Sequence, residues 1–463
     1  MDLAKRLIDK LSRIVGPERV LTDPAHLDEL SWDALSEGRL HPRKRPKIAA
    51  PLCVVLPVST DEVREVVLLA NKAKVPVVPY GGGSGLMGGA LSLQPGIVLD
   101  LRGMDRILKI DQKAQTARVR AGAVLESLEK RLNKKGLILG HDPWTLPVAT
   151  VGGAISTDSL GYRGGKYGSM GDQVLGLEVV LPNGELLRTR SVPKSSTGIG
   201  LKHLFIGGEG CFGIVTEATL KVFSMPERRS LHGFLFASFE QGFAAVQEIF
   251  ARGLKPALMD FGDDDDELHG RAVLYLALEG PKEMVGAEER LILAICRGEG
   301  VEKLPQERAE RFWRERHVIA HRFMHNRHLR RERSAEAIRR DWVHVALPAS
   351  QVLAFRKAAM EIITRRGVSL QESGLWTQPE LFSMRLATEG RNGEEAQLIL
   401  EDTVEELLRL VQKMGGSMEY CHGVGIKLAP LMAEEHGYGL EIMRQIKKVL
   451  DPNNIMNPGK MGL

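Results

Sequence analysis

The pattern of apolar and polar positions divides the chain into two regions. Residues 51–223 consist of short β-branched segments separated by glycine clusters, as is typical of strands joined by tight turns. We expect a helix at 60–74, because Thr60 precedes an apolar repeat with Asp61 and Glu62 in the first turn. Asn183-Gly184 predicts a hairpin. Strands are expected at 53–56, 75–78, 97–99, 116–121, 175–181 and 213–223.

After Pro226 the pattern changes to longer alternating segments. It predicts strands at 231–239 and 273–278 and helices at 241–252 and 394–414. A chain of 463 residues exceeds what one hydrophobic core usually organises. We therefore expect an α+β protein with a helical segment at 1–50, one domain at 51–224, a second at 225–430 and a C-terminal segment at 431–463.

Charge and cysteine content exclude several classes of protein. The formal net charge of +4 is too small for a nucleic-acid-binding footprint, and it suits small anionic substrates better. The four cysteines lie far apart, with no spacing typical of zinc or iron–sulfur sites, which predicts free thiols in a reducing compartment. No apolar run approaches the roughly 20 residues that span a bilayer. We expect a cytoplasmic protein, or one held at a membrane only through a partner.

A glycine-rich loop follows the strand expected at 75–78. It reads Pro79, Tyr80, Gly81, Gly82, Gly83, Ser84, Gly85. Glycine allows backbone N–H groups to approach a pyrophosphate and to adopt positive φ values. Such a run is often only a tight turn, however, and the loop has neither the Walker lysine nor the G-x-G-x-x-G spacing.

Further motifs follow this loop in a fixed order. They are Gly140-His141-Asp142-Pro143, Ala149-Thr150-Val151-Gly152-Gly153, Lys166-Tyr167-Gly168 and the segment Gly207 to Glu217. The ordered set resembles the FAD-binding domain of the vanillyl-alcohol oxidase or p-cresol methylhydroxylase superfamily. Cys421-His422-Gly423-Val424-Gly425 and the Asn457-Pro458-Gly459-Lys460 ending are similar to the C-terminal domain of FAD-linked oxidases, such as the flavin subunit of glycolate oxidase and D-lactate dehydrogenase. There is a second similarity to alkylglycerone-phosphate synthase.

The resemblance implies a two-subdomain flavin domain, an α/β cap domain on the substrate side and a tail that returns to the flavin. Ser84 stands where members with covalent FAD have histidine, which favours noncovalent FAD, and Tyr80 stands where many relatives have arginine. Carried over by position, the FAD contacts are Pro79 to Gly85, Trp144, Thr145, Thr150, Gly152, Gly153, Thr157, Asp158, Glu209, Gly213, Ile214, Val215 and Asn457.

The resemblance also implies an oxidoreductase that oxidises a small 2-hydroxy acid by hydride transfer to flavin N5. His422 is the expected base, because histidine accepts a proton near neutrality. Arg316, within Trp313-Arg314-Glu315-Arg316, is the expected carboxylate anchor, and Tyr420 is a candidate proton donor that can equally be a packing residue. The remaining basic residues between 308 and 340 are interpreted as a solvated face, with an anion-binding or docking face as the alternative.

Metal-dependent relatives carry a histidine-rich segment and a glutamate before the final histidine. In this chain the corresponding segment, Gln371 to Leu381, contains no histidine, and Cys421 occupies the glutamate position. We therefore expect no metal site. Three alternative functions stay open: a transferase like alkylglycerone-phosphate synthase, an oxidase of a phenolic or other alcohol, and a noncatalytic subunit. Relatives pass electrons to varied acceptors, so an iron–sulfur or other electron-accepting subunit is a candidate partner, and a homo-oligomer is a further candidate.

Overall fold

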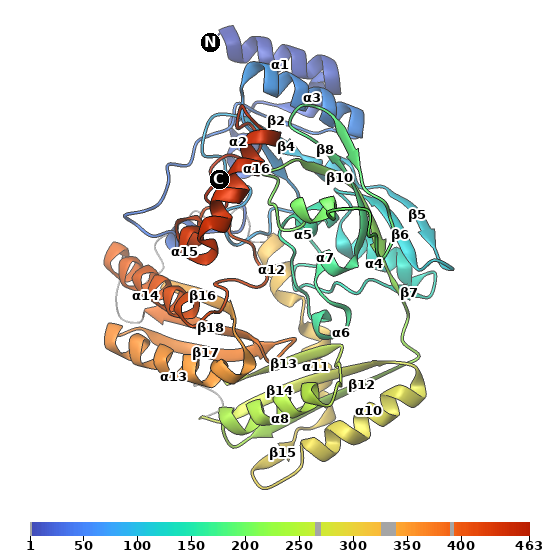
Figure 1. Ribbon diagram of the computed structural model, residues 1–463, viewed down its shortest axis with the longest axis vertical. Coiled ribbons are helices and arrows are strands. Elements are labelled where there is room, and N and C mark those ends of the chain that lie inside the picture. The colour runs from blue at the N-terminus through green and yellow to red at the C-terminus, as the bar shows by residue number, and fades with distance from the viewer. Residues whose placement is uncertain (1, 264–269, 326–338, 389–392) are drawn as a thin grey trace.

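The computed structural model describes residues 2–263, 270–325, 339–388 and 393–463. Figure 1 shows two parts, with the N-terminal part above and a large sheet backed by helices below. The C-terminal helices α15 (Met432–His436) and α16 (Tyr438–Leu450) return to the upper part.

The first sheet of the N-terminal part has four strands. Their spatial order is β1 (Val20–Leu21), β2 (Cys53–Val55), β4 (Ile97–Asp100) and β3 (Val77–Tyr80). Helices α1 (Asp2–Val15), α2 (Pro24–Glu29) and α3 (Thr60–Ala73) accompany it. The segment 1–50 therefore supplies a strand of this sheet, because β1 pairs with β2. The C-terminal segment also joins it, since Val77 forms a parallel bridge with Met456.

The second sheet of this part has five strands. In spatial order they are β5 (Ile107–Asp111), β6 (Thr116–Arg120), β10 (Ile214–Lys221), β8 (Val174–Val180) and β9 (Leu186–Arg188). The hairpin expected at Asn183-Gly184 joins β8 to β9. A small pair links β7 (Leu137–Ile138) to β11 (Phe223–Ser224). The accompanying helices are α4 (Leu125–Asn133), α5 (Val151–Ser156), α6 (Gly164–Tyr167) and α7 (Met170–Gln173).

The C-terminal part contains a seven-stranded sheet in which every neighbouring pair is antiparallel. The order is β15 (Val301–Lys303), β12 (Arg228–Phe236), β14 (Ala272–Gly280), β13 (Leu258–Asp263), β17 (Ser369–Trp376), β18 (Leu381–Thr388) and β16 (Arg339–Ala346). Helices α8 (Phe239–Ala251), α10 (Lys282–Ile295), α13 (Ala349–Arg366) and α14 (Gly393–Lys413) pack on it. Helix α11 (Gln306–Glu315) contacts β12, and α12 (Val318–His325) lies toward the N-terminal part (Figure 1).

The expected elements are present, with boundaries that differ by a few residues. The strand expected at 75–78 occupies Val77–Tyr80, because α3 ends in a left-handed Lys74 and the Val75 N–H bonds back to the Ala70 carbonyl. The strand expected at 231–239 occupies Arg228–Phe236, because the Ser238 side chain caps α8 and so places Phe239 in the helix. Local capping decided both boundaries.

Candidate active site

A cavity of about 1540 Å³ lies between the glycine-rich loops of the N-terminal part and the β17–β18–β16 end of the large sheet. This volume exceeds the roughly 300–1,000 Å³ of pockets for drug-sized ligands, so the cavity has room for a dinucleotide and a small substrate. The predicted cofactor residues line it, with the exception of Asp158 and Asn457. His422 and Tyr420 also line it.

The loop from Gly81 to Gly85 is pressed against the opposite segment of the chain. A Cβ atom on Gly81 would lie 2.4 Å from Thr150 Oγ1, and one on Gly82 would lie 2.3 Å from the Val148 carbonyl oxygen. Gly83 has a φ of +61°. In the described part of the chain, no hydrogen bond uses the N–H groups of Gly83, Ser84 or Gly85. Free donors in a loop that lines a cavity fit the pyrophosphate of a dinucleotide.

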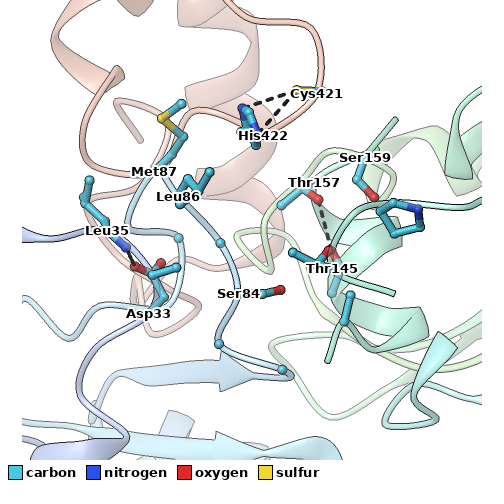
Figure 2. Close-up of a pocket in the computed structure, with 18 of the residues that line it drawn as sticks. Asp33, Leu35, Ser84, Leu86, Met87, Thr145, Thr157, Ser159, Cys421 and His422 are labelled. Carbon is cyan, nitrogen blue, oxygen red and sulfur yellow. Dashed lines mark hydrogen bonds between the residues drawn. The ribbon is translucent and has the colours of Figure 1, made fainter. Parts of the chain in front are cut away.

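The wall facing this loop is formed by residues 144–157. Thr150 caps α5, because its Oγ1 accepts a hydrogen bond from the Gly153 N–H at 3.3 Å. Figure 2 shows Ser84 pointing toward the wall that carries Thr145 and Thr157. Cys421 and His422 lie beyond them, on the loop that follows α14, which we call the C-terminal loop. The cavity is therefore closed by three segments that are far apart in the sequence.

Asp158 and Asn457, which do not line the cavity, hold its walls in place. Asp158 accepts a hydrogen bond from the Gly171 N–H at 2.8 Å. Asn457 donates to the carbonyl oxygens of Gly89 and Glu209, at 2.8 and 2.7 Å. Both residues have a positive φ. In the structure these two residues therefore contact the segments behind the cavity wall and not the cavity itself, where the predicted FAD contact would be.

Glu209 connects the flavin-side wall to the C-terminal loop. Its carboxylate accepts hydrogen bonds from the N–H groups of Val424 and Gly425, the latter at 2.9 Å. Burial raises the pKa of Glu209 to about 7, although these two backbone N–H groups lower it in part. The residue that the sequence assigned to FAD therefore also positions the loop that carries His422.

The loop carrying His422 is organised around one buried carboxylate. Glu419 Oε1 accepts hydrogen bonds from the N–H groups of Tyr420, Cys421 and His422, at 3.0, 2.9 and 3.0 Å. It also lies 3.4 Å from Nδ1 of His422. Burial by itself raises the pKa of Glu419, but the charge and hydrogen bond of His422 lower it to about 2. An ionised Glu419 thus orients the imidazole of His422.

Two polar residues beside His422 were missed by the sequence analysis. His344 and Ser383 are cross-strand partners on β16 and β18, and His344 Nδ1 lies 2.8 Å from Ser383 Oγ. Ser383 Oγ lies 2.7 Å from the Tyr420 hydroxyl. The rings of His344 and His422 are 4.6 Å apart. Burial, with the charge of His422 as the next cause, lowers the pKa of His344 to about 3, so His344 is neutral.

Two long-range connections bring these strands to the C-terminal loop. Ala346 at the end of β16 exchanges two backbone hydrogen bonds with Ser417, at 3.0 and 2.8 Å. Asp341 on the same strand pairs with Arg39 at 2.7 Å and with Lys427. Burial raises the pKa of Asp341, but the charges of Arg39 and Lys427 outweigh it and hold the pKa well below its usual range. The loop is therefore fixed to β16 on both sides of His422.

The structure does not bring Arg316 into the cavity. Its Nε donates to Asp142 Oδ2 at 2.9 Å, and its guanidinium stacks on the Trp313 ring at 3.9 Å. His317 Nε2 lies 2.9 Å from the other oxygen of Asp142. Burial raises the pKa of Asp142, but the charges of Arg163 and Arg316 and the bond from His317 lower it well below its usual range. Arg316 therefore joins α11 to the N-terminal part, and the basic residues at 326–338 lie outside the described residues.

A different arginine occupies the cavity wall near His422. Arg385 lies on β18, two residues after Ser383, so both side chains are on the same face of the sheet. Both line the cavity. Its Nε is buried without a hydrogen-bond partner among the described residues, and its nearest carboxylate is Glu372 at 3.7 Å. The sequence offered no motif for Arg385, because only the pairing of β17, β18 and β16 places it here.

Comparisons with known proteins match both parts of the chain to known domains. Residues 51–190 match the FAD binding domain, and residues 225–461 match the C-terminal domain of FAD linked oxidases. Glycolate oxidase subunit GlcD from Bacillus subtilis is 30% identical over 99% of this chain and 97% of its own length. D-lactate dehydrogenase from Anaerostipes hadrus is 30% identical over 98% of this chain and 97% of its own.

Among solved structures, alkyldihydroxyacetonephosphate synthase superposes with a TM-score of 0.80 at 21% identity, covering 98% of this chain and 85% of its own. At this identity the likeness concerns the fold alone. The comparisons confirm the predicted fold, the similarity to all three proteins and FAD as the cofactor. No helix of the described residues has the length and apolar character needed to cross a membrane.

Proposed function

Because this chain belongs to the FAD linked oxidases, we propose that it oxidises a small 2-hydroxy acid to the corresponding 2-oxo acid. The observation that carries the proposal is the group of His422, Tyr420 and Arg385 at one end of the FAD-sized cavity. Such an oxidation needs a base for the hydroxyl proton and a cation for the carboxylate. FAD, when bound, supplies the hydride acceptor.

His422 serves as the base in this proposal. Glu419 Oε1 lies 3.4 Å from Nδ1, so Nε2, which has Cys421 Sγ at 3.5 Å, is the nitrogen proposed to accept the proton of the substrate hydroxyl. Tyr420 lies beside it and can donate a hydrogen bond to the substrate from the hydroxyl that also contacts Ser383. The substrate loses one proton to His422 and the hydrogen on its 2-carbon as hydride, which leaves a carbonyl group.

Arg385 replaces Arg316 as the proposed carboxylate anchor. Nε of Arg385 is buried without a hydrogen-bond partner among the described residues, and its guanidinium forms a long ion pair with Glu372 at 3.7 Å, whereas Arg316 donates to Asp142 at 2.9 Å. A planar guanidinium can bind a carboxylate through two parallel hydrogen bonds. Burying such a donor without an acceptor is unfavourable, and a bound carboxylate would remove that cost. The small anionic substrate expected from the sequence therefore has a specific binding group.

The central experiment is anaerobic titration of the FAD-loaded protein with glycolate, D-lactate and longer D-2-hydroxy acids, together with uncharged phenolic alcohols. We expect one or more of the acids to bleach the oxidised flavin absorbance. Arg385→Gln should raise KM for that acid at least about tenfold, as loss of a charge-assisted pair predicts, while Arg316→Gln should affect thermal stability more than KM. If no acid bleaches the flavin, or only phenolic alcohols do, the proposal is wrong.

A transferase is the second candidate, and one observation favours it. Arg340 on β16 lines the same cavity as Arg385, and the strand register places both side chains on the same face of the sheet, where a second cation could bind a phosphate. This candidate predicts exchange on an acyl dihydroxyacetone phosphate with no net flavin reduction. Product formation without an electron acceptor would support it, whereas bleaching by a hydroxy acid would favour the oxidase.

The Bacillus subtilis relative is by name a subunit, so we also propose an electron-accepting partner subunit for this chain. Ser84 in the glycine loop stands where members with covalent FAD have histidine. We therefore propose that FAD is bound without a covalent bond. Denaturation followed by ultrafiltration tests this. FAD that is not covalently attached passes through the filter, whereas covalent FAD is retained with the chain. The cytoplasmic location and a homo-oligomeric state stay predictions.

A further inference from the structure

The cavity continues from the group around His422 across the face of the large sheet. Gly262, Gly374 and Ser383 are paired neighbours on β13, β17 and β18, and we call this row the glycine floor. A Cβ atom on Gly374 would lie 2.4 Å from the Phe261 carbonyl oxygen, so the contact between the strands requires glycine there. Gly374 and Ser383 line the cavity. The cavity therefore has an open surface without large side chains next to Ser383.

Asp260 borders the glycine floor on one side. It lies two residues before Gly262 and opposite Trp376, so both side chains are on the face that carries the floor. Both residues line the cavity. The Tyr162 ring lies 5.3 Å from the Trp376 ring, edge to face. Burial, followed by the charge of Asp260, raises the pKa of the Tyr162 hydroxyl, so Asp260 stands in the cavity wall beside two aromatic side chains.

The carboxyl group of Asp260 has no hydrogen-bond or ion-pair partner among the described residues. Burial, with the charge of Glu372 as the second cause, raises its pKa to about 7. Both the protonated and the ionised form are therefore present near neutral pH. Burying a polar group without a partner is unfavourable, and a ligand that forms a hydrogen bond with Asp260 would remove that cost.

The proposed carboxylate anchor lies on the other side of the glycine floor. Arg385 is two residues after Ser383 and opposite Glu372, at 3.7 Å. Strands β13 and β18 are two strand spacings apart, about 10 Å. A two-carbon acid held at Arg385 would not reach Asp260, whereas a longer acid can lie across the glycine floor and contact both.

We propose that Asp260 binds a hydroxyl group on the tail of the substrate, so that the preferred substrate is a 2-hydroxy acid with at least one further hydroxyl group. In this arrangement the carboxylate is held by Arg385, the 2-hydroxyl group lies at His422, and the tail crosses the glycine floor. The inference rests on the proposed function, because it specifies which class of hydroxy acid the protein oxidises.

A hydroxyl group fits Asp260 better than an ammonium group does. A hydroxyl donates one hydrogen bond and accepts others, so it can pair with either form of a carboxyl group. The Trp376 and Tyr162 rings can pack against the C–H groups of a hydroxylated tail. An ammonium group can also bind beside aromatic rings. Protonated Asp260 offers it no charge, however, and the charge of Glu372 is offset by Arg385.

The test uses the FAD-loaded protein and D-2-hydroxy acids of four and five carbons that end in a methyl, a hydroxymethyl or an aminomethyl group. We expect the hydroxymethyl acids to reduce the flavin anaerobically with a second-order rate constant at least about tenfold above that of the methyl acids of equal length, because a methyl group leaves Asp260 without a partner. Equal rate constants for the two, or a preference for the aminomethyl acids, would overturn the proposal.

Asp260→Asn and Asp260→Leu separate hydrogen bonding from charge. Asparagine keeps a donor and an acceptor, so it should retain most of the preference for hydroxymethyl over methyl acids, whereas leucine should reduce the ratio of the two rate constants to about one. Glu302→Leu, at an exposed glutamate of β15 outside the cavity lining, is the control and should keep the ratio of the unaltered protein. Flavin content and thermal unfolding confirm that each variant is folded. Full preference in Asp260→Leu, or its loss in Asp260→Asn, would contradict the assignment.

Binding of 2-oxo acids, which have no hydride to transfer from the 2-carbon, tests the tail site separately from the reaction. Calorimetry on the oxidised, FAD-loaded protein should give a dissociation constant at least about tenfold lower for a 2-oxo acid that ends in a hydroxymethyl group than for one that ends in a methyl group. If this preference is present but no hydroxy acid bleaches the flavin, the tail site stands and the proposed function is wrong. If hydroxy acids bleach the flavin without such a preference, the proposed function stands and the tail site is wrong.

Discussion

The two ends of the cavity present different kinds of groups to a ligand. At the flavin end, Gly83, Ser84 and Gly85 offer backbone N–H groups, and Gly81 and Gly82 approach residues 148–150 closely. At the proposed substrate end, the wall includes the side chains of His344, Ser383, Arg385 and His422. The first end is built by contiguous glycine motifs, and the second by strands and a loop that meet only in the folded chain.

Because of this difference, the two ends should tolerate amino-acid substitution to different degrees. A backbone cradle depends on the absence of side chains, so few residue types are tolerated there. A side-chain wall can exchange one group for another while the strands stay in place, as with Cys421 at the position where metal-dependent relatives have glutamate. We therefore expect variants at the substrate end to change chemistry and variants at the flavin end to change cofactor affinity.

The largest effect is expected for His422→Asn. Loss of the base should lower the rate of anaerobic flavin reduction by a hydroxy acid about 10²- to 10⁴-fold, with FAD content unchanged. Stopped-flow absorbance measures the rate. His436→Asn, at an exposed histidine of α15, is the control and should reduce flavin at the original rate. If His422→Asn keeps the original rate of flavin reduction, His422 is not the base.

Glu209 joins the two ends, and its ionisation should make stability depend on pH. Its pKa of about 7 in the folded chain lies above the ordinary 4.5, so the folded state retains a proton that the unfolded chain has released. The free energy of unfolding should therefore fall as pH rises from about 4.5 through 7 and level off above, by on the order of 3 kcal/mol.

Glu209→Gln should flatten this dependence, because the variant has no ionisable group. Urea unfolding of the FAD-saturated protein at several pH values gives the measurement. Glu394→Gln, at an exposed glutamate in the first turn of α14, should leave the slope as it was. The same slope in Glu209→Gln would show that Glu209 is not the group responsible.

At the flavin end, Gly82→Ala should weaken FAD binding. The added Cβ would lie 2.3 Å from the Val148 carbonyl oxygen, which is backbone and cannot rotate away. Overpacking of this kind costs about 1–3 kcal/mol, or roughly 5- to 150-fold in the FAD dissociation constant. Fluorescence titration of the apoprotein measures it. Gly286→Ala in α10 meets only ordinary contacts and should bind FAD normally. Normal affinity in Gly82→Ala would contradict the backbone cradle.

The smallest effect is expected for Tyr420→Phe. The change removes the hydroxyl that lies 2.7 Å from Ser383 Oγ but keeps the ring. Loss of one neutral hydrogen bond costs about 0.5–1.5 kcal/mol, so flavin reduction should slow by less than roughly tenfold. A loss as large as that of His422→Asn would instead make Tyr420 a proton donor in the reaction.

Most secondary structure could be predicted from local patterns in the sequence, and the residues proposed for the flavin end followed from the family resemblance. Glycines must stand where the chain approaches itself closely or adopts a positive φ, and strands and helices follow local periodicity, so both leave a record in consecutive residues. The glycine run 81–85 was recognised in this way, whereas its assignment to FAD, like that of Thr150, came from the family resemblance. Boundaries shifted only where a cap such as Ser238 decided them. Even there, the physical cause was local.

At the proposed substrate end, the tertiary structure determines which residues meet. His344 faces Ser383 through the register of β16 and β18, and the Ala346–Ser417 bridge brings His422 to both. Single histidines, serines and arginines on alternating strands carry no local signal, because a one-residue change in register would turn each to the other face. Arg316 was selected by resemblance and is paired with Asp142 in the fold, whereas Arg385, the proposed anchor, carries no local signal in the sequence.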